Sequence, residues 1–167
     1  MFAYTEANNV SLMRRTAVSR TLQADIEIQA APDQVWEVLT DFAAYHRWNP
    51  FIVEASGTPL PGQRLELHMR LPGRRAMTFR PEVLEADPGR KLRWLGRLLI
   101  PGLFDGEHSF TIEPVGPDRV HLTQHEEFRG LLAPLLLARI GEPTLAGFHQ
   151  MNEALKARAE QPTSTRS

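Results

Sequence analysis

Cysteine is absent from the sequence, which excludes disulfide bonds, thiol nucleophiles and thiolate metal sites. No apolar run approaches the roughly 18 residues that span a membrane. The stretch from Met1 to Arg20 has no apolar segment of signal-peptide length. The six histidines show no metal-binding spacing. We therefore expect a soluble, cytoplasmic protein without a membrane span, a metal or another cofactor.

Neither sign of charge dominates. The chain has 19 Lys and Arg against 20 Asp and Glu, a formal net charge of −1. Basic runs such as Arg14-Arg15 and Arg74-Arg75 are short, whereas neutralising nucleic-acid phosphates needs clustered Lys and Arg. We interpret these runs as solvated surface charge, and nucleic acid is not an expected partner.

The length of 167 residues suits a single folded domain. Residues 1–22 show no clear periodicity and are interpreted as an N-terminal arm, which is a possible contact in a homodimer. The domain is expected over residues 23–160. The polar residues 161–167 are expected to form a flexible tail.

Alternation of apolar and polar residues predicts seven strands. These are expected at residues 24–29, 51–56, 64–71, 76–86, 91–98, 107–115 and 120–128. Two short helices are expected after the first strand, one from Pro32 and one over 42–46. The C-terminal segment has helical spacing over 131–140 and 144–159, with an interruption near Gly141-Glu142-Pro143.

This order of elements predicts an α+β fold. Consecutive strands joined by short turns form an antiparallel meander. One long helix is available to cover the inner face of the sheet, so the sheet has to curl around it. We expect a helix-grip fold, in which a curved seven-stranded antiparallel sheet wraps around the long C-terminal helix.

The last predicted strand has polar groups on its inner face. Gln124 and Glu126 alternate with apolar residues there, and an unpaired buried polar group costs about 1–3 kcal/mol. A cavity that admits water or a polar ligand group explains the pattern. If residues 116–118 form a three-residue loop, Val115 faces Arg119, Phe110 opposes Gln124, and His108 opposes Glu126 at a Cβ separation of about 4.5–5.5 Å.

A His108–Glu126 pair could act as an acid and a base, because apolar surroundings and a charged partner both change protonation equilibria. The alternative is a satisfied pair that only holds two strands in register. Other residues on the expected inner faces would line the ligand cavity. With His108, Gln124 and Glu126, the candidate binding residues are Trp48, Phe51, Leu67, Met69, Met77, Phe79, Trp94, Gly96, Phe110, Phe148 and Met151.

Some of these positions have a second interpretation. Gly96 removes a side chain and leaves room for a ligand, or it marks a bulge. Trp48 and Phe51 edge the entrance, or they are hinge packing. A leucine stripe over 131–140 is interpreted as a lid or core helix. Membrane docking is disfavoured for that stripe because no basic face flanks it.

Four motifs resemble a known superfamily. They are Ala31-Pro32-Asp33-Gln34-Val35-Trp36, Trp48-Asn49-Pro50-Phe51, Gly106-Glu107-His108-Ser109-Phe110 and Glu126-Glu127-Phe128-Arg129-Gly130-Leu131-Leu132. In this order they are similar to the START/Bet v 1-like (SRPBCC) superfamily, in its polyketide cyclase/dehydrase-like branch, over residues 24–159. The resemblance implies the helix-grip fold and an internal cavity. It implies no single reaction, because members include cyclases, lipid carriers, hormone receptors and stress-response binders.

Three functions remain open at this point. The first is binding of a small hydrophobic molecule, lipid-like or aromatic and polyketide-like, in the cavity. The second is a polyketide cyclase or dehydratase that uses His108 and Glu126. The third is an interaction protein whose cavity is only residual core.

Overall fold

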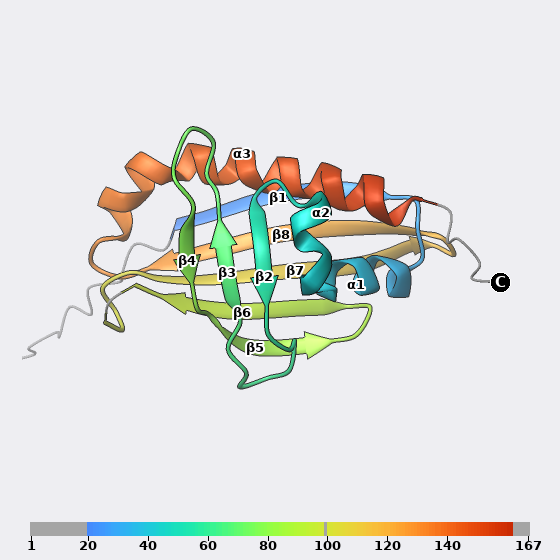
Figure 1. Cartoon of the computed structure of the whole chain (residues 1–167), viewed down its shortest axis with the longest axis horizontal. Coiled ribbons are helices and arrows are strands. Elements are labelled where there is room, and N and C mark those ends of the chain that lie inside the picture. Colours follow the sequence, from blue (N-terminus) through green and yellow to red (C-terminus); the bar gives the residue numbers. More distant parts are fainter. Residues whose placement is uncertain (1–19, 99, 162–167) are drawn as a thin grey trace, which may run out of the picture.

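Two antiparallel sheets and one long helix form the described part of the chain, residues 20–98 and 100–161 of a computed structural model (Figure 1). The larger sheet has the strand order β1-β8-β7-β6-β5, and the smaller has β2-β3-β4. The strands are β1 Arg20–Ile28, β2 Ile52–Ser56, β3 Glu66–Met69, β4 Met77–Phe79, β5 Glu82–Asp87, β6 Lys91–Arg97, β7 Asp105–Gly116 and β8 Arg119–Arg129. The helices are α1 Pro32–Thr40, the short 3-10 turn η1 Phe42–Ala44, α2 Tyr45–Trp48 and α3 Ala133–Ala159.

The α+β class and the long C-terminal helix are confirmed. The single seven-stranded sheet is wrong, because five strands lie in one sheet and three in another. The predicted strand over 76–86 divides into β4 and β5 at Pro81, which has no N–H for a sheet ladder. The Pro81 carbonyl still accepts the Leu65 amide at 2.9 Å. The two sheets therefore meet at this proline.

The register of the last hairpin is confirmed. Phe110 pairs with Gln124 and His108 with Glu126. The turn differs from the expected three-residue loop, because Gly116 pairs with Arg119 and the register shifts after Pro114. This irregularity at Val115 leaves the inward positions nearer the site unchanged.

Helix α3 is continuous, so the predicted interruption near Pro143 is wrong. A proline inside a helix removes the hydrogen bond to the carbonyl four residues earlier, here Arg139. Arg74 Nη2 donates to that carbonyl at 3.2 Å. The carbonyl therefore keeps a donor, supplied from the loop between β3 and β4.

The predicted N-terminal arm falls almost entirely on residues 1–19, which lie outside the described residues, as do residues 162–167 of the tail. β1 begins at Arg20 and pairs with β8 along its whole length. The Asn152 amide on α3 donates to the Ala24 carbonyl at 3.2 Å. This bond ties the helix to β1.

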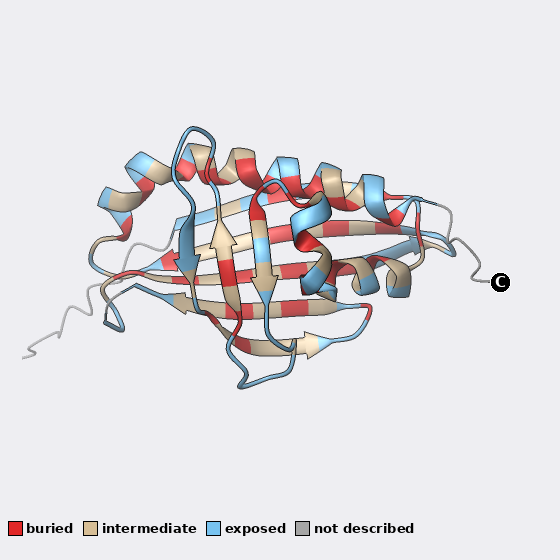
Figure 2. Cartoon of the chain, in the orientation of Figure 1, coloured by how far each residue is buried: buried red, intermediate tan, exposed pale blue. Residues whose placement is uncertain are grey.

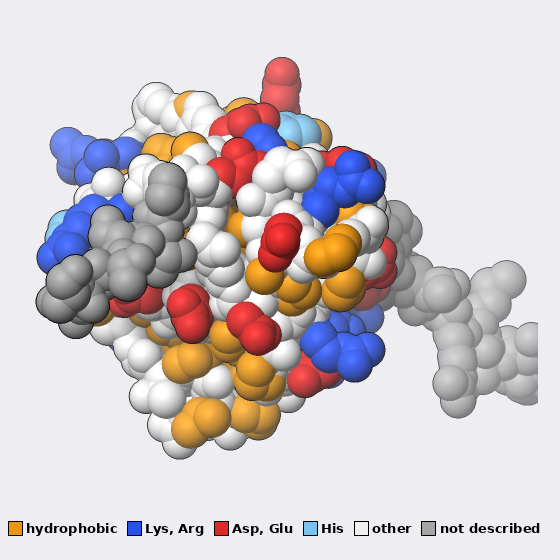
Figure 3. Space-filling model, turned by 90° about the vertical axis from the view of Figure 1, so that its right-hand side faces the viewer, with side chains coloured by type: hydrophobic (Ala, Val, Ile, Leu, Met, Phe, Trp, Pro, Cys, Tyr) orange, Lys and Arg blue, Asp and Glu red, His pale blue; other side chains and the backbone are white. Residues whose placement is uncertain are grey.

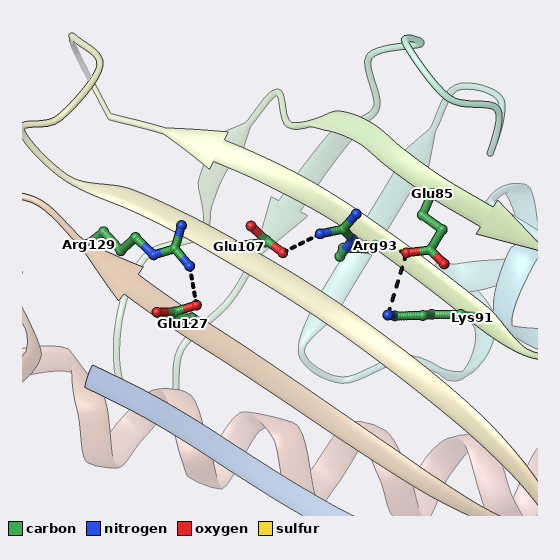
Figure 4. Close-up of polar contacts among 6 residues, drawn as sticks. All are labelled: Glu85, Lys91, Arg93, Glu107, Glu127 and Arg129. Atoms are coloured by element: carbon green, nitrogen blue, oxygen red, sulfur yellow. Dashed lines mark hydrogen bonds and ion pairs between the residues drawn. The ribbon is translucent and has the colours of Figure 1, made fainter. Parts of the chain in front are cut away.

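The outer face of the larger sheet carries a row of ion pairs (Figure 4). Arg93 contacts Glu107 at 2.8 Å and Glu85 at 3.1 Å. The hydrogen bond that Arg93 donates to Glu107 is the main cause that raises the pKa of Arg93. Buried residues gather instead on the faces toward α3 and the smaller sheet (Figure 2). The interior between these elements is where a ligand site has to lie.

Candidate ligand-binding cavity

A cavity of about 80 Å³ lies between the two sheets and α3. Its wall is mostly apolar, and its lining residues are Phe51, Ile52, Leu67, Met69, Leu71, Met77, Phe79, Pro81, Trp94, Gly96, Arg97, Leu98, Phe104, Gly106, His108, Glu126, Phe128, Ile140 and Thr144. Apolar walls with a few polar groups are typical of small-molecule sites.

His108 is the most enclosed polar residue of this wall, with 3% of its side chain exposed. Its ring stacks on Trp94 at 5.0 Å with an angle of 10° between the planes. It also contacts Phe110 at 4.8 Å and the edge of Phe148 at 5.0 Å. These three rings fix the imidazole plane, so that each ring nitrogen has one defined direction.

Both nitrogens of His108 have a side-chain neighbour. Nδ1 lies 3.5 Å from Glu126 Oε2, and Nε2 lies 3.1 Å from the amide nitrogen of Gln124. With the amide nitrogen donating to Nε2, the ring proton of a neutral imidazole is on Nδ1, directed at the carboxylate. The amide oxygen of Gln124 is buried without a partner. A half-turn of the amide would bring that oxygen to Nε2 in place of the nitrogen.

Gly106 makes room for the carboxylate. A Cβ at this position would lie 2.9 Å from Glu126 Oε1 and 3.6 Å from the Phe128 ring. Any larger residue would displace the acidic end of Glu126. Gly96 has space, because the nearest atom to an added Cβ is 3.8 Å away. Gly96 lines the cavity, which agrees with its interpretation as a position that leaves room for a ligand.

Phe51 is positioned from two sides. The Asn49 side chain accepts the amides of Phe51 and Ile52 at 3.0 and 2.9 Å, which fixes the turn before β2. The ring of Phe51 lies on Gly147 of α3, where an added Cβ would fall 2.2 Å from a ring carbon. The ring therefore reaches the cavity only because position 147 has no side chain.

The predicted site residues fall into three groups. Those that line the cavity are Phe51, Leu67, Met69, Met77, Phe79, Trp94, Gly96, His108 and Glu126. Those that are buried beyond its lining are Phe110, Gln124, Phe148 and Met151. Trp48 lies apart from the cavity and packs against Tyr45 at 5.0 Å. Its interpretation as packing fits this position better than an entrance.

Thr144 and Gly106 are two of the ten cavity-lining residues that sequence reasoning missed. Thr144 lies on α3, just after the glycine and proline that suggested a break in the helix. Continuing the helical spacing of Phe148 and Met151 back by one turn would have placed Thr144 on the inner face. Gly106 continues the inward alternation of His108 and Phe110 by one step.

Nothing in the described part of the chain gathers three His, Asp or Glu side chains into a possible metal site. Among the same residues, no helix is long and apolar enough to cross a membrane.

Solved structures with the same fold come from several organisms. A hypothetical protein from Helicobacter pylori matches with a TM-score of 0.70 at 16% identity, over 95% of this chain and 100% of that chain. A START superfamily protein from Mycobacterium smegmatis matches at 0.63 and 23% identity, over 84% and 97% of the two chains. The Zhui aromatase/cyclase from Streptomyces sp. R1128 matches at 0.62 and 18%, over 87% and 98%. At these identities the likeness shows a START-like helix-grip fold.

The sequence profile of the family described as polyketide cyclase / dehydrase and lipid transport matches residues 19–160. The chain belongs to this family, as its four motifs indicated. A search of curated proteins gave no match.

Proposed function

We propose that this protein binds a small hydrophobic molecule, lipid-like or aromatic, in the cavity between its two sheets and α3. One observation carries the proposal: an apolar cavity has a histidine–carboxylate pair in its wall, the buried His108 and the partly buried Glu126. The apolar lining favours a ligand with little polar surface. The pair would receive one polar group of that ligand, such as a hydroxyl or a carbonyl.

The size of the cavity restricts the ligand further. A volume of about 80 Å³ holds roughly five to eight waters, at about 10–15 Å³ each on this measure. Sites for larger organic ligands measure about 300–1,000 Å³. A multi-ring or long-chain ligand would therefore have to widen the mouth. Met69 and Met77 suit this role, because unbranched thioether side chains adapt their shape.

The test fills the cavity without disturbing the sheet. Gly96→Leu adds an apolar side chain where an added Cβ meets nothing closer than 3.8 Å. We expect it to lower the affinity for an apolar fluorescent probe at least tenfold, and to remove any small molecule seen by native mass spectrometry of the purified protein. Thr111→Leu, which adds similar bulk on the outer face of β7, is the control. Equal probe binding by both variants and the original protein would refute the cavity as the binding site.

A second candidate function is catalysis, favoured by the 3.5 Å contact between His108 Nδ1 and Glu126 Oε2. A histidine and a carboxylate that both touch one ligand can pass a proton to one atom and remove it from another. One protein of similar fold is described as an aromatase/cyclase. A cyclisation or dehydration of a polyketide-like substrate would use the pair in this way.

Glu126→Gln separates the two functions. The substitution keeps the volume and removes the base, so a carrier should bind its probe about as well as before. An enzyme of the proposed type should keep most of its binding and lose about 10²–10⁴-fold in turnover. Turnover of a polyketide substrate that survives this substitution would exclude Glu126 as the base.

A further inference from the structure

Exposed apolar side chains surround the mouth of the cavity. Of the seven large apolar side chains that are exposed in the described part of the chain, five lie here: Met77, Leu98, Ile100, Leu131 and Leu135. Met77 and Leu98 line the cavity itself. The start of α3 is joined to the loop between β6 and β7, because the amides of Leu131 and Leu132 donate to the carbonyls of Gly102 and Leu103.

We call residues 70–77, 97–98, 100–104 and 130–141 the mouth surface. These segments contain five of the 19 basic residues and none of the 20 acidic ones. The basic residues are Arg70, Arg74, Arg75, Arg97 and Arg139, and all five are exposed. At the opposite end of the molecule, acidic and basic side chains lie side by side (Figure 3). The mouth surface therefore carries an excess of basic side chains that the near-neutral net charge of the chain does not reveal, although Asp105 directly beside it accepts the Gly102 amide at 3.0 Å.

This arrangement corrects the expectation that no basic face flanks the leucine stripe of 131–140. Within that stretch only Arg139 is charged. The other arginines come from the loop between β3 and β4 and from the end of β6 (Figure 1). Arg74 bonds to the Arg139 carbonyl, which holds that loop against α3. The basic face is built by the fold from segments distant in sequence.

We propose that the mouth surface docks on an anionic lipid membrane. Leu131, Leu135 and Ile100 would enter the boundary between headgroups and acyl chains, while the arginines contact lipid phosphates and carboxylates. Leu131 is 79% exposed and Leu135 is 60% exposed, and protruding leucines enter a fluid bilayer without a partner of matching shape. Two copies of the chain would not pair through this surface, because both faces are positive.

Docking in this orientation places the cavity mouth at the membrane. An apolar molecule could then pass between bilayer and cavity without crossing water, which costs free energy in proportion to the apolar area exposed. This consequence rests on the proposed ligand-binding function. The docking itself does not, because it uses side chains on the outside of the mouth.

The experiment measures co-sedimentation with phosphatidylcholine vesicles, with and without phosphatidylserine, at low and high salt. We expect binding only to the anionic vesicles and release by salt. Each arginine near an anionic surface contributes roughly fivefold, so Arg74→Gln with Arg75→Gln should weaken partitioning about 30-fold. Leu131→Ser with Leu135→Ser should weaken it at least about tenfold.

Matched controls lie away from the mouth. Arg47→Gln with Arg90→Gln removes two exposed arginines of α2 and of the turn between β5 and β6, and Leu60→Ser removes an exposed leucine. All three substitutions should leave vesicle binding unchanged. Thermal unfolding of every variant checks that the fold is retained.

Gly96→Leu separates this inference from the proposed function, because a filled cavity should still dock. No binding to anionic vesicles at low salt would overturn the docking proposal, and so would equal binding by the mouth variants and their controls. Binding of the mouth surface to a purified acidic protein, with no vesicle binding, would also overturn it by replacing the lipid with a protein partner.

Discussion

Gly147→Ala is expected to destabilise the protein, although alanine is the better helix former. The added Cβ would lie 2.2 and 2.5 Å from two ring carbons of Phe51, a fully buried side chain. Real Cβ contacts are almost never shorter than 3.0 Å. The ring also has Phe148 against it at 5.7 Å, so it can move only toward the cavity or by shifting α3.

The magnitude follows from two opposing effects. Replacing glycine by alanine inside a helix gains about 0.8–1 kcal/mol. Overpacking a buried site costs about 1–3 kcal/mol, and a contact this short belongs at the upper end. We therefore expect a net loss of about 1–2 kcal/mol in the free energy of unfolding, measured by urea denaturation.

Gly141 supplies the control on the same helix. It is also buried, but an added Cβ meets only Leu137 at 3.9 Å. Gly141→Ala should therefore stabilise by about 0.8–1 kcal/mol. Adding Phe51→Leu to Gly147→Ala should recover part of the loss by removing the ring that clashes. A Gly147→Ala protein as stable as the Gly141→Ala protein would refute this account of how Phe51 is positioned.

Three further predictions concern the cavity, the helix and the outer face. Gly106→Ala puts a methyl group 2.9 Å from the flexible end of the cavity carboxylate, so the urea midpoint should change little while histidine-selective ¹⁵N NMR signals shift. Pro143→Ala restores an N–H donor to the Arg139 carbonyl and should raise the free energy of unfolding by about 1–3 kcal/mol in the same urea assay. The pKa of Asp25 is lowered, first by the hydrogen bond from Gln23. The ionised Asp25 side chain therefore stabilises the fold at pH values above its ordinary pKa of 3.8, and this contribution is lost as the pH falls through the lowered pKa. Asp25→Asn should reduce the loss in the free energy of unfolding between neutral and acid pH by under about 1 kcal/mol, because the side chain is 38% exposed. Urea denaturation over a series of pH values measures this, and an unchanged pH dependence would contradict it.

The closing hairpin was predictable because its pattern is local. Strict alternation fixes which side chains of a strand share a face, and a short turn fixes which residues oppose each other. His108 and Glu126 could therefore be paired from sequence alone. The irregularity at Val115 lies beyond the last inward pair, and it left this pairing intact.

The division into two sheets could not be predicted with the same rule. The stretch over 76–86 places Met77, Phe79 and Val83 on one face, as a single strand would. In the structure β4 ends before Pro81 and β5 begins after it. Proline is compatible with an edge strand or with a break, and only the position of the neighbouring Leu65 segment decides between them.

The continuity of α3 depended on a contact from far along the chain. Local preferences at Gly141 and Pro143 favour a break in the helix. The contact from Arg74 and the packing of the helix along β1 outweigh those preferences. The same loop supplies most of the basic face at the mouth, which is why that face was invisible in the sequence of the helix.

The pairing of β1 with β8 has a consequence for synthesis of the chain. Partners such as Ile28 and Val120 are roughly a hundred residues apart, and such long-range contacts form late and slowly. On the ribosome, the first strand has to wait for nearly all the rest of the chain before it meets its neighbour. The intermediate strands spend that interval with apolar faces uncovered, which favours a chaperone encounter. A nascent chain halted before β8 would lack the strand that lies between β1 and β7 in the larger sheet.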